Sequence, residues 1–116
     1  MHIQTVWNVN ATDEYLAWFG EQPGEAKAAI LEKVLLLQEF GPLLGRPHAD
    51  TLKGSRRKNL KELRARTGSQ ILRVLFCFDE KRDALLLVGG NKKGKNERDF
   101  YRKLIAEADM LVDRYI

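Results

Sequence analysis

Hydrophobic residues in the first half of the chain recur at helical spacing. Between Glu25 and Phe40 the apolar side chains lie three or four residues apart, which predicts an amphipathic helix with one stripe in the core. That stripe consists of Ala26, Ile30, Val34 and Leu37, and it is widened by Leu31 and Leu35. A strand over Ile3–Val9 and a short helix, capped by Asn10 and ended near Gly20, are expected before it.

The second half of the chain contains three apolar runs that predict strands. The runs Asn59–Arg66, Gln70–Asp79 and Ala84–Gly90 are separated by connections of hairpin length, so they should form an antiparallel meander. The first run places Leu60 and Leu63 on opposite faces, which predicts a bulge or an irregular start in this strand.

Asn96 is placed to cap a last helix, and the order of elements then predicts the fold class. The apolar face of this helix consists of Phe100, Leu104, Ala108, Leu111 and Tyr115. The order β-α-α-β-β-β-α predicts an α+β fold with helices packed on a small antiparallel sheet. We expect one domain over residues 1–116, in which the long connection Gly41–Lys58 is of a length that is often functional.

The composition predicts a soluble globular protein, with 44% hydrophobic and 31% charged residues. Cys77 is the only cysteine and lies in an apolar run, which favours a buried structural thiol in a reducing cytoplasm. The N-terminal residues lack the pattern of a signal peptide, and no apolar run approaches the ~20 residues of a membrane helix. We therefore expect a cytoplasmic protein without membrane contact.

The net charge of +4 is distributed unevenly along the chain. Residues 1–45 hold two basic and six acidic side chains, whereas residues 46–116 hold eighteen basic and ten acidic ones. The segment from Lys53 to Arg73 contains eight basic residues and one acidic residue, Glu62. Such a block predicts a polyanionic partner, which could be nucleic acid, a phosphate-rich surface or an acidic protein.

The commonest catalytic motifs are missing from the sequence. His2 and His48 are the only histidines, so no Cys/His metal site or Ser/His/Asp arrangement can be assembled, and neither a metal nor a cofactor is expected. Gly89 and Gly90 form only a glycine pair at a strand end, and no phosphate-binding glycine loop is present. The basic residues remain as the candidates for chemistry.

The expected meander brings several basic side chains toward one end of the sheet. These are Arg64, Arg66, Arg73, Lys92 and Lys93, and the N-terminus of the last helix adds its positive dipole there. Such a pocket suits cleavage of RNA by its own 2′-hydroxyl group, which requires a proton acceptor, charge to stabilise the phosphorane and a proton donor. Arginine supplies fixed charge, a lysine crowded by cations can transfer protons, and Tyr101 could stack on a base or donate a proton.

Each of these residues also has a structural interpretation. Glu62 could balance Arg64 and Arg66 on an exposed sheet face, and the lysines after the third strand could form a solvated loop. Arg73 lies in an apolar central strand, where a buried cation needs a partner that a phosphate could provide. General RNA-binding roles are expected for Lys53, Arg56, Arg57, Lys58, Lys61, Arg66 and Lys95. His48 is interpreted as a loop residue, and Tyr101 could equally pack in the core.

Several motifs in series resemble a known family. The segments 60–64 (LKELR), 73–79 (RVLFCFD) and 85–93 (LLLVGGNKK), followed by Phe100-Tyr101, are similar to the phage-derived, HigB-like branch of the RelE/ParE toxin superfamily. The resemblance covers nearly the whole chain. It implies a RelE-like fold and a ribosome-associated mRNA endoribonuclease of a type II toxin–antitoxin system. It also implies a cognate antitoxin, usually a helix-turn-helix DNA-binding protein.

The resemblance assigns activity to Arg64, Arg73 and the two lysines Lys92 and Lys93, which match family positions. Related toxins often have a histidine or tyrosine near the end of the last strand, where this chain has Asn91 and the lysines. The general acid and base are therefore left open. Two other functions remain: a ParE-like toxin that inhibits gyrase without catalysis, which the basic block disfavours, and a non-catalytic nucleic-acid-binding regulatory domain.

Overall fold

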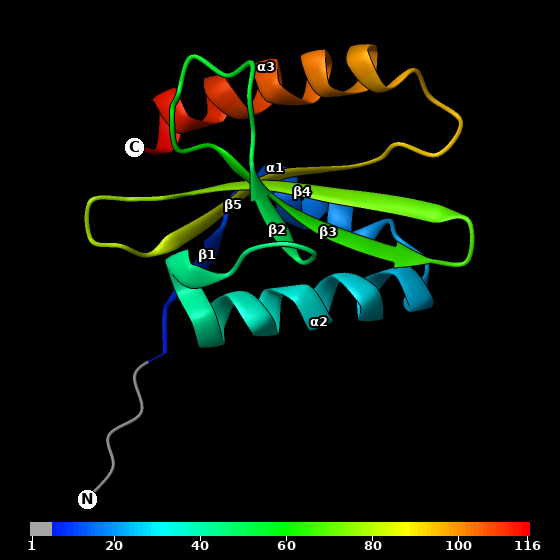
Figure 1. Cartoon of the computed structure of the whole chain (residues 1–116), viewed down its shortest axis with the longest axis horizontal. Coiled ribbons are helices and arrows are strands. Elements are labelled where there is room, and N and C mark those ends of the chain that lie inside the picture. Colours follow the sequence, from blue (N-terminus) through cyan, green and yellow to red (C-terminus); the bar gives the residue numbers. More distant parts are fainter. Residues whose placement is uncertain (1–5) are drawn as a thin grey trace, which may run out of the picture.

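The computed structural model describes residues 6–116 as five strands and three α-helices (Figure 1). The helices are α1 (Asp13–Gly20), α2 (Gly24–Phe40) and α3 (Glu97–Tyr115), with a short 3-10 turn at Gly41–Leu43. The strands are β1 (Val9–Ala11), β2 (Ala49–Thr51), β3 (Lys61–Thr67), β4 (Gln70–Phe78) and β5 (Ala84–Asn91). The α+β class predicted from the sequence is confirmed.

One five-stranded sheet in the order β1-β5-β4-β3-β2 forms the middle layer of the molecule (Figure 1). Strands β3, β4 and β5 form the predicted antiparallel meander. The short strand β2 pairs antiparallel with β3, and β1 pairs parallel with β5, so the sheet is not purely antiparallel. Helix α2 lies on one side of this sheet and α3 on the other.

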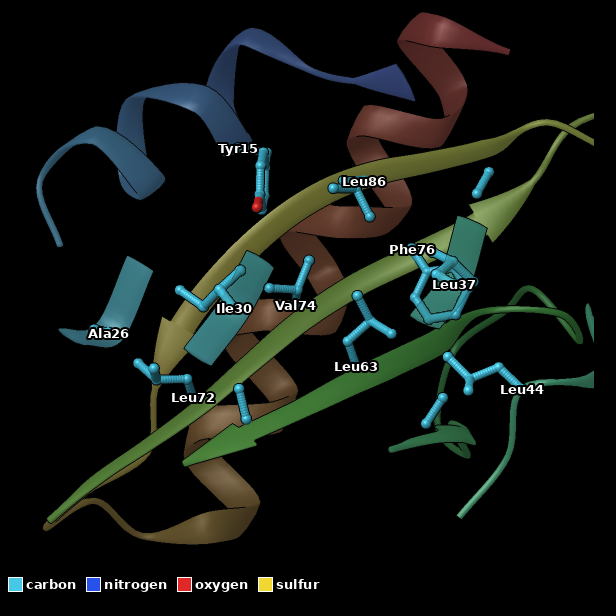
Figure 2. Packing of buried hydrophobic residues seen from close by; sticks show 13 residues of the cluster. Tyr15, Ala26, Ile30, Leu37, Leu44, Leu63, Leu72, Val74, Phe76 and Leu86 are labelled. Atoms are coloured by element: carbon cyan, nitrogen blue, oxygen red, sulfur yellow. The ribbon is translucent and has the colours of Figure 1, made fainter. Parts of the chain in front are cut away.

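Two hydrophobic clusters form because strand side chains alternate between the two faces. Leu72, Val74 and Phe76 of β4 pack with Tyr15 of α1 and with α2 (Figure 2). On the other face, buried residues of β4 and β5, which include Leu75, Cys77 and Leu87, pack against Phe100, Leu104 and Ala108 of α3. This double coverage explains why the central run of the sequence is apolar at nearly every position.

The stripe of α2 is narrower than the sequence predicted. Ala26, Ile30 and Leu37 are buried, but the side chains of Leu31 and Leu35 are 48% and 63% exposed. The expectation that these two leucines widen the buried stripe is wrong, because a helix on a flat sheet buries only the face that it turns toward the sheet. Tyr115 is likewise 42% exposed at the end of α3, where its hydroxyl group donates to Glu14.

Several predicted boundaries also change. Thr12, not Asn10, caps α1: its hydroxyl oxygen accepts from the amide of Tyr15. The first strand is Val9–Ala11, and the part of the predicted strand Ile3–Val9 that falls on residues 1–5 lies outside the described residues. The register shift lies between Leu75 and Phe76, not in β3. Asn96 caps α3 as predicted, by accepting from the amide of Asp99.

Strand β2 lies within the segment 41–58, which the sequence analysis treated as one long connection. This strand is only three residues long, but it places Asp50 opposite Glu62 of β3. Among residues 6–116, no helix is long and apolar enough to cross a membrane.

Candidate functional site

A hollow of about 620 Å³ lies between the outer part of the sheet and the start of α3, and we call it the central hollow. Its polar lining comes from β2, β3 and β4, from the segments that follow β2 and β5, and from α3. It consists of Asp50, Thr51, Lys53, Glu62, Arg64, Arg73, Lys92, Glu97, Arg98 and Tyr101. Four of the five residues predicted to be catalytic therefore line one hollow. The fifth, Lys93, is exposed outside it, and its Nζ donates to Ser69 Oγ at 2.9 Å.

The register of the sheet aligns the two arginines. Arg64 of β3 lies directly opposite Arg73 of β4, and Arg73 lies opposite Gly90 of β5. Two like charges on adjacent strands repel each other unless a counter-charge is close. The side chain of Arg73 is 12% exposed and that of Arg64 is 35% exposed, so the repulsion would be weakly screened.

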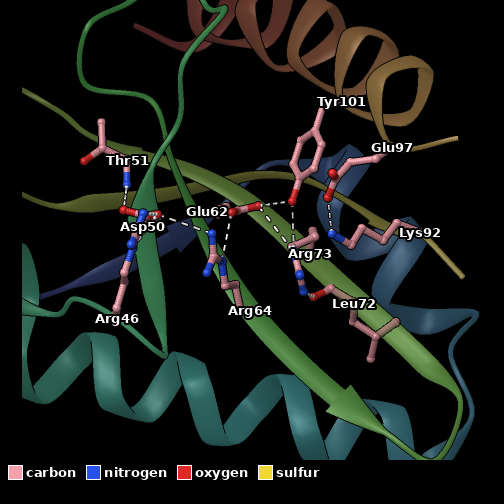
Figure 3. A network of polar contacts seen from close by, with 10 residues as sticks. All are labelled: Arg46, Asp50, Thr51, Glu62, Arg64, Leu72, Arg73, Lys92, Glu97 and Tyr101. Carbon is pink, nitrogen blue, oxygen red and sulfur yellow. Dashed lines mark hydrogen bonds and ion pairs between the residues drawn. The ribbon is translucent and has the colours of Figure 1, made fainter.

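Buried Glu62 supplies that counter-charge. Its side chain is 2% exposed, and its Oε2 accepts from Arg64 Nε at 3.0 Å (Figure 3). Its Oε1 lies 3.4 Å from Arg73 Nε and accepts a hydrogen bond of 2.7 Å from the Tyr101 hydroxyl group. Arg73 Nε in turn donates to the Tyr101 oxygen at 3.0 Å. One carboxylate therefore fixes both arginines and the tyrosine.

Sequence reasoning did not select Glu62 as a site residue. The interpretation that it balances Arg64 and Arg66 on an exposed face is wrong, because the carboxylate is buried beneath α3 and bonded to Tyr101. The available signal was the position of this acidic residue between Leu60 and Leu63 in a predicted strand, since a carboxylate buried in a sheet needs hydrogen-bond partners. The protein partners of Arg73 also show that a phosphate is not required to compensate its burial.

Tyr101 stays protonated under neutral conditions. Burial, followed by the hydrogen bond to Glu62, raises the pKa of Tyr101 to about 12. Its hydroxyl group can therefore donate a hydrogen bond at neutral pH, whereas a phenolate base would be almost absent.

Two further carboxylates stand at the rim of the central hollow. Asp50 accepts from Arg46 Nε at 2.9 Å and from Arg64 at 3.3 Å, and the hydrogen bond from Arg46 is the main cause of a lowered pKa for Asp50. Glu97 pairs with Lys92 Nζ at 2.6 Å, which lowers the pKa of Glu97. Both carboxylates are therefore ionised at neutral pH. The sequence analysis did not select these two carboxylates, because it assigned Asp50 to a long loop and Glu97 to the start of a helix.

The glycine pair at the end of β5 allows both helical layers to approach the sheet. A Cβ atom on Gly90 would lie 2.9 Å from the ring of Phe100 on α3, and one on Gly89 would lie 2.3 Å from the ring of Trp18 on α1. Because Phe100 precedes Tyr101, the absence of a side chain at Gly90 helps set the height of Tyr101 above Arg73. The pair has a structural use that the sequence analysis did not assign.

The residues predicted to bind RNA lie in several places. Lys53 lines the central hollow, and Arg66 lines an adjacent hollow on the α2 side of the sheet. Arg56 and Arg57 both pair with Asp113 near the end of α3. Exposed Lys95 lines a separate hollow between α1 and α3, Lys58 is exposed, and half-buried Lys61 begins β3. His48 lies in the loop before β2 and contacts helix α2, because its Nδ1 accepts from Lys33 Nζ at 2.8 Å.

Within the described part of the chain, no group of three or more His, Cys, Asp or Glu side chains is arranged to hold a metal ion. Cys77 is buried as predicted, and burial raises the pKa of its thiol to about 11, so it is a poor nucleophile at neutral pH. The central hollow instead presents fixed cations, a neutral hydroxyl donor and ionised carboxylates, a combination suited to binding and cleaving a phosphodiester.

The chain matches the family described as phage-derived protein Gp49-like (DUF891) over residues 17–113. Two proteins of Mycobacterium tuberculosis, named "Putative toxin HigB2" and "Putative toxin HigB3", are 38% and 39% identical to it over 98 and 99 residues. These alignments cover 84% and 85% of this chain. They cover 84% of HigB3 but 49% of HigB2, so the chain spans about half the length of HigB2.

Solved structures of RelE proteins share this fold. A mutant of the E. coli toxin RelE in the free state has a TM-score of 0.65 at 12% identity, with 97% of this chain and 100% of that chain covered. The toxin–antitoxin complex RelBE2 of Mycobacterium tuberculosis gives 0.56 at 17% identity, with 75% and 99% covered. The archaeal RelE–RelB complex of Pyrococcus horikoshii gives 0.55 at 21% identity, with 78% and 98% covered.

Proposed function

Because this chain belongs to the phage-derived Gp49-like family and is a HigB-like relative of the RelE toxins, we propose that it is the toxin of a type II toxin–antitoxin system. We propose further that it forms one toxin domain that cuts mRNA, with no metal, and so inhibits translation. The observation that carries this proposal is the arginine pair, Arg64 and Arg73, held beside Tyr101 by buried Glu62.

The proposed reaction is an attack of the RNA 2′-hydroxyl group on the adjacent phosphorus. The 2′-oxygen forms a bond to phosphorus and the bond to the 5′-oxygen breaks, which leaves a 2′,3′-cyclic phosphate on one fragment and a 5′-hydroxyl group on the other. Arg64 and Arg73 would stabilise the charge that develops on the phosphorane. The Tyr101 hydroxyl group has one proton, which it donates to Glu62 in this structure, so it would have to turn this proton toward the phosphorane to stabilise it.

Proton transfer requires groups at the rim of the hollow. Lys92 is suitably placed to protonate the leaving 5′-oxygen, since its Nζ lies in the same hollow and 5.5 Å from the centre of the Tyr101 ring. Asp50 is the candidate for taking the proton of the 2′-hydroxyl group, because its carboxylate lines the hollow, whereas Glu97 is ion-paired with Lys92 and would orient that lysine. Glu62 is too buried and too fully bonded for either role.

The proposed partners follow from the family and from the charge of the site. RelBE2 is described as a toxin–antitoxin complex and the archaeal structure as a RelE–RelB complex. These complexes support a cognate antitoxin for this chain, proposed as a helix-turn-helix DNA-binding protein. An antitoxin with an acidic segment would be attracted to the basic hollow. mRNA, translated on the ribosome in the cytoplasm, is the proposed substrate.

Growth after induced expression tests this function, with wild type compared with Arg73→Ala and with Lys81→Ala as a matched surface control. We expect growth arrest and discrete mRNA cuts, mapped by primer extension, from wild type and from the Lys81 variant. Loss of both effects in Arg73→Ala, with the variant still folded by circular dichroism, would support the proposal. Arrest without cuts would instead indicate a protein target such as gyrase, and no arrest would indicate a non-catalytic binding domain.

A further inference from the structure

A second, smaller hollow of about 320 Å³ lies on the α2 side of the sheet, and we call it the flanking hollow. Lys33 of α2 and Arg66 of β3 line it. It shares Arg64 and Arg73 with the central hollow, so these two arginines form a common wall.

The flanking hollow is strongly cationic. Four basic side chains line it, and Glu32 is its only acidic lining residue. Lys33 Nζ lies 2.8 Å from His48 Nδ1, and it forms no ion pair with a carboxylate among residues 6–116. Exposed Arg66 makes no ion pair with any residue between positions 6 and 116, whereas Arg64 and Arg73 are paired with carboxylates. The positive charge added by this hollow is therefore available to an anion from outside.

The two hollows meet at strand β3: residues of α3 line the central hollow, residues of α2 line the flanking hollow, and Arg64 lines both. Strand β2 pairs with Lys61–Leu63, and the carbonyl oxygen of His48 accepts from the amide of Arg64, so the outer edge of β3 is open from Ala65 onward. Figure 3 shows Arg64 on β3 between α2 and α3, the helices that contribute to the flanking and central hollows respectively. A chain that occupies both hollows must bend around this edge past the two arginines.

We propose that the flanking hollow binds the phosphate adjacent to the cleaved one and so selects single-stranded RNA. The proposal rests on the proposed ribonuclease function. Because the hollows share one wall, neighbouring phosphates of one strand can fill them together. A single strand can bend sharply between neighbouring phosphates, whereas a duplex resists bending over a length of ~50 nm and cannot wrap one β-strand. Lys33 and Arg66 thereby act as substrate-positioning residues, not as proton-transfer groups.

Binding of a short RNA that cannot be cleaved tests the site without relying on turnover. The probe is a fluorescent oligonucleotide with 2′-O-methyl groups throughout, measured by anisotropy over a range of salt concentrations. Lys33→Gln and Arg66→Gln should each weaken binding several-fold and reduce the salt slope by about 0.7, the value for one lost phosphate contact on a single strand. Lys81→Gln, which removes the same charge from the distant β4–β5 turn, should leave both quantities unchanged.

Neutral methylphosphonate groups then locate the contact. They replace one phosphate of the probe at a time, and each substituted probe is measured with each variant. The phosphate whose neutralisation has no further effect in Lys92→Gln marks the central hollow, because Lys92 lines that hollow and not the flanking one. The phosphate that behaves in this way in Lys33→Gln and Arg66→Gln should be its immediate neighbour on one side.

The outcomes separate this site from the ribonuclease function. If the wild type binds as described but does not cut the corresponding unmodified RNA on ribosomes, the flanking site stands and the ribonuclease proposal fails. If the wild type cuts RNA but Lys33→Gln and Arg66→Gln bind and cut like Lys81→Gln, the flanking site is overturned. It is also overturned if the wild type shows no binding at low salt, or if a duplex of the same sequence binds as tightly as the single strand.

Discussion

At the scale of single residues, Glu62 determines whether the candidate site exists. A pair of facing arginines under a helix would be destabilised by repulsion and desolvation without a carboxylate between them. Glu62 accepts from Arg64 and Tyr101 and lies 3.4 Å from Arg73, so it orients the groups that would contact the phosphate without reaching it. It is a positioning residue whose loss should disturb several groups together.

Glu62→Gln should therefore reduce catalysis more than substrate binding. The amide keeps the shape but loses the charge, so we expect kcat to fall by about 10- to 100-fold, as for other groups that orient catalytic side chains, with a smaller change in KM. The pKa of Tyr101 should also fall from about 12, since the bond to Glu62 is one of the causes that raise it. Ultraviolet absorbance titration measures this pKa, and an unchanged tyrosine titration would contradict the role assigned to Glu62.

At the scale of elements, the meander and α3 bring the site together. The predicted hairpins bring Arg64, Arg73 and Lys92 to one end of the sheet, and in the structure these three residues line the central hollow. Lys93 could not be separated from Lys92 by the same reasoning, because a loop residue's direction depends on the turn that follows β5. Strand β2 was not predicted, since three residues with one apolar side chain carry no periodic signal.

Helix packing explains a further part that sequence patterns could not predict. The sequence did not decide whether Tyr101 packs in the core or takes part in the reaction, because its height above the sheet depends on how closely α3 approaches β5. Gly90 permits that approach. Pattern reasoning at Leu31 and Leu35 failed for a related reason: hydrophobic spacing reports a helix but not the width of the face that its partner covers.

Gly90→Ala should damage both stability and activity. The added methyl group would lie 2.9 Å from the Phe100 ring, so this ring or α3 itself must shift, at a cost of about 1–3 kcal/mol in the free energy of unfolding. Cleavage should fall because Tyr101 follows Phe100 on this helix. Gly20→Ala is the control, as nothing lies within 4 Å of its added Cβ. Urea unfolding measures the free energy of unfolding of both variants. Equal values would show that Gly90 does not set the distance between α3 and β5.

At the scale of the whole molecule, charge and burial divide the protein into distinct parts. The acidic first half supplies α1 and α2, and the basic second half supplies most of the central hollow.

Burial of neutral acids inside the two clusters makes the fold sensitive to alkali. Burial raises the pKa of Tyr15 and Tyr101 to about 12 and that of Cys77 to about 11.

Stability should therefore be lost at high pH. A raised pKa in the folded state means that these groups favour folding fully below their unfolded pKa values of about 9 to 10, and that this contribution disappears as the pH rises through 11 to 12. Urea unfolding at pH 8 and in this alkaline range measures the loss. Tyr15→Phe cannot ionise, so it should lose less stability than the wild type over the same interval. An equal loss in both proteins would contradict the assignment to Tyr15.

The chemistry of the cut ends tests the central claim most directly. Purified wild type and Arg73→Ala would be added to ribosomes that are translating a defined mRNA, and the fragments would be analysed for their terminal groups. The account predicts a 2′,3′-cyclic phosphate and a 5′-hydroxyl group from the wild type, with the cuts strongly reduced in Arg73→Ala. A 3′-hydroxyl group with a 5′-phosphate, or the same cuts from the folded variant, would contradict cleavage by the arginine pair.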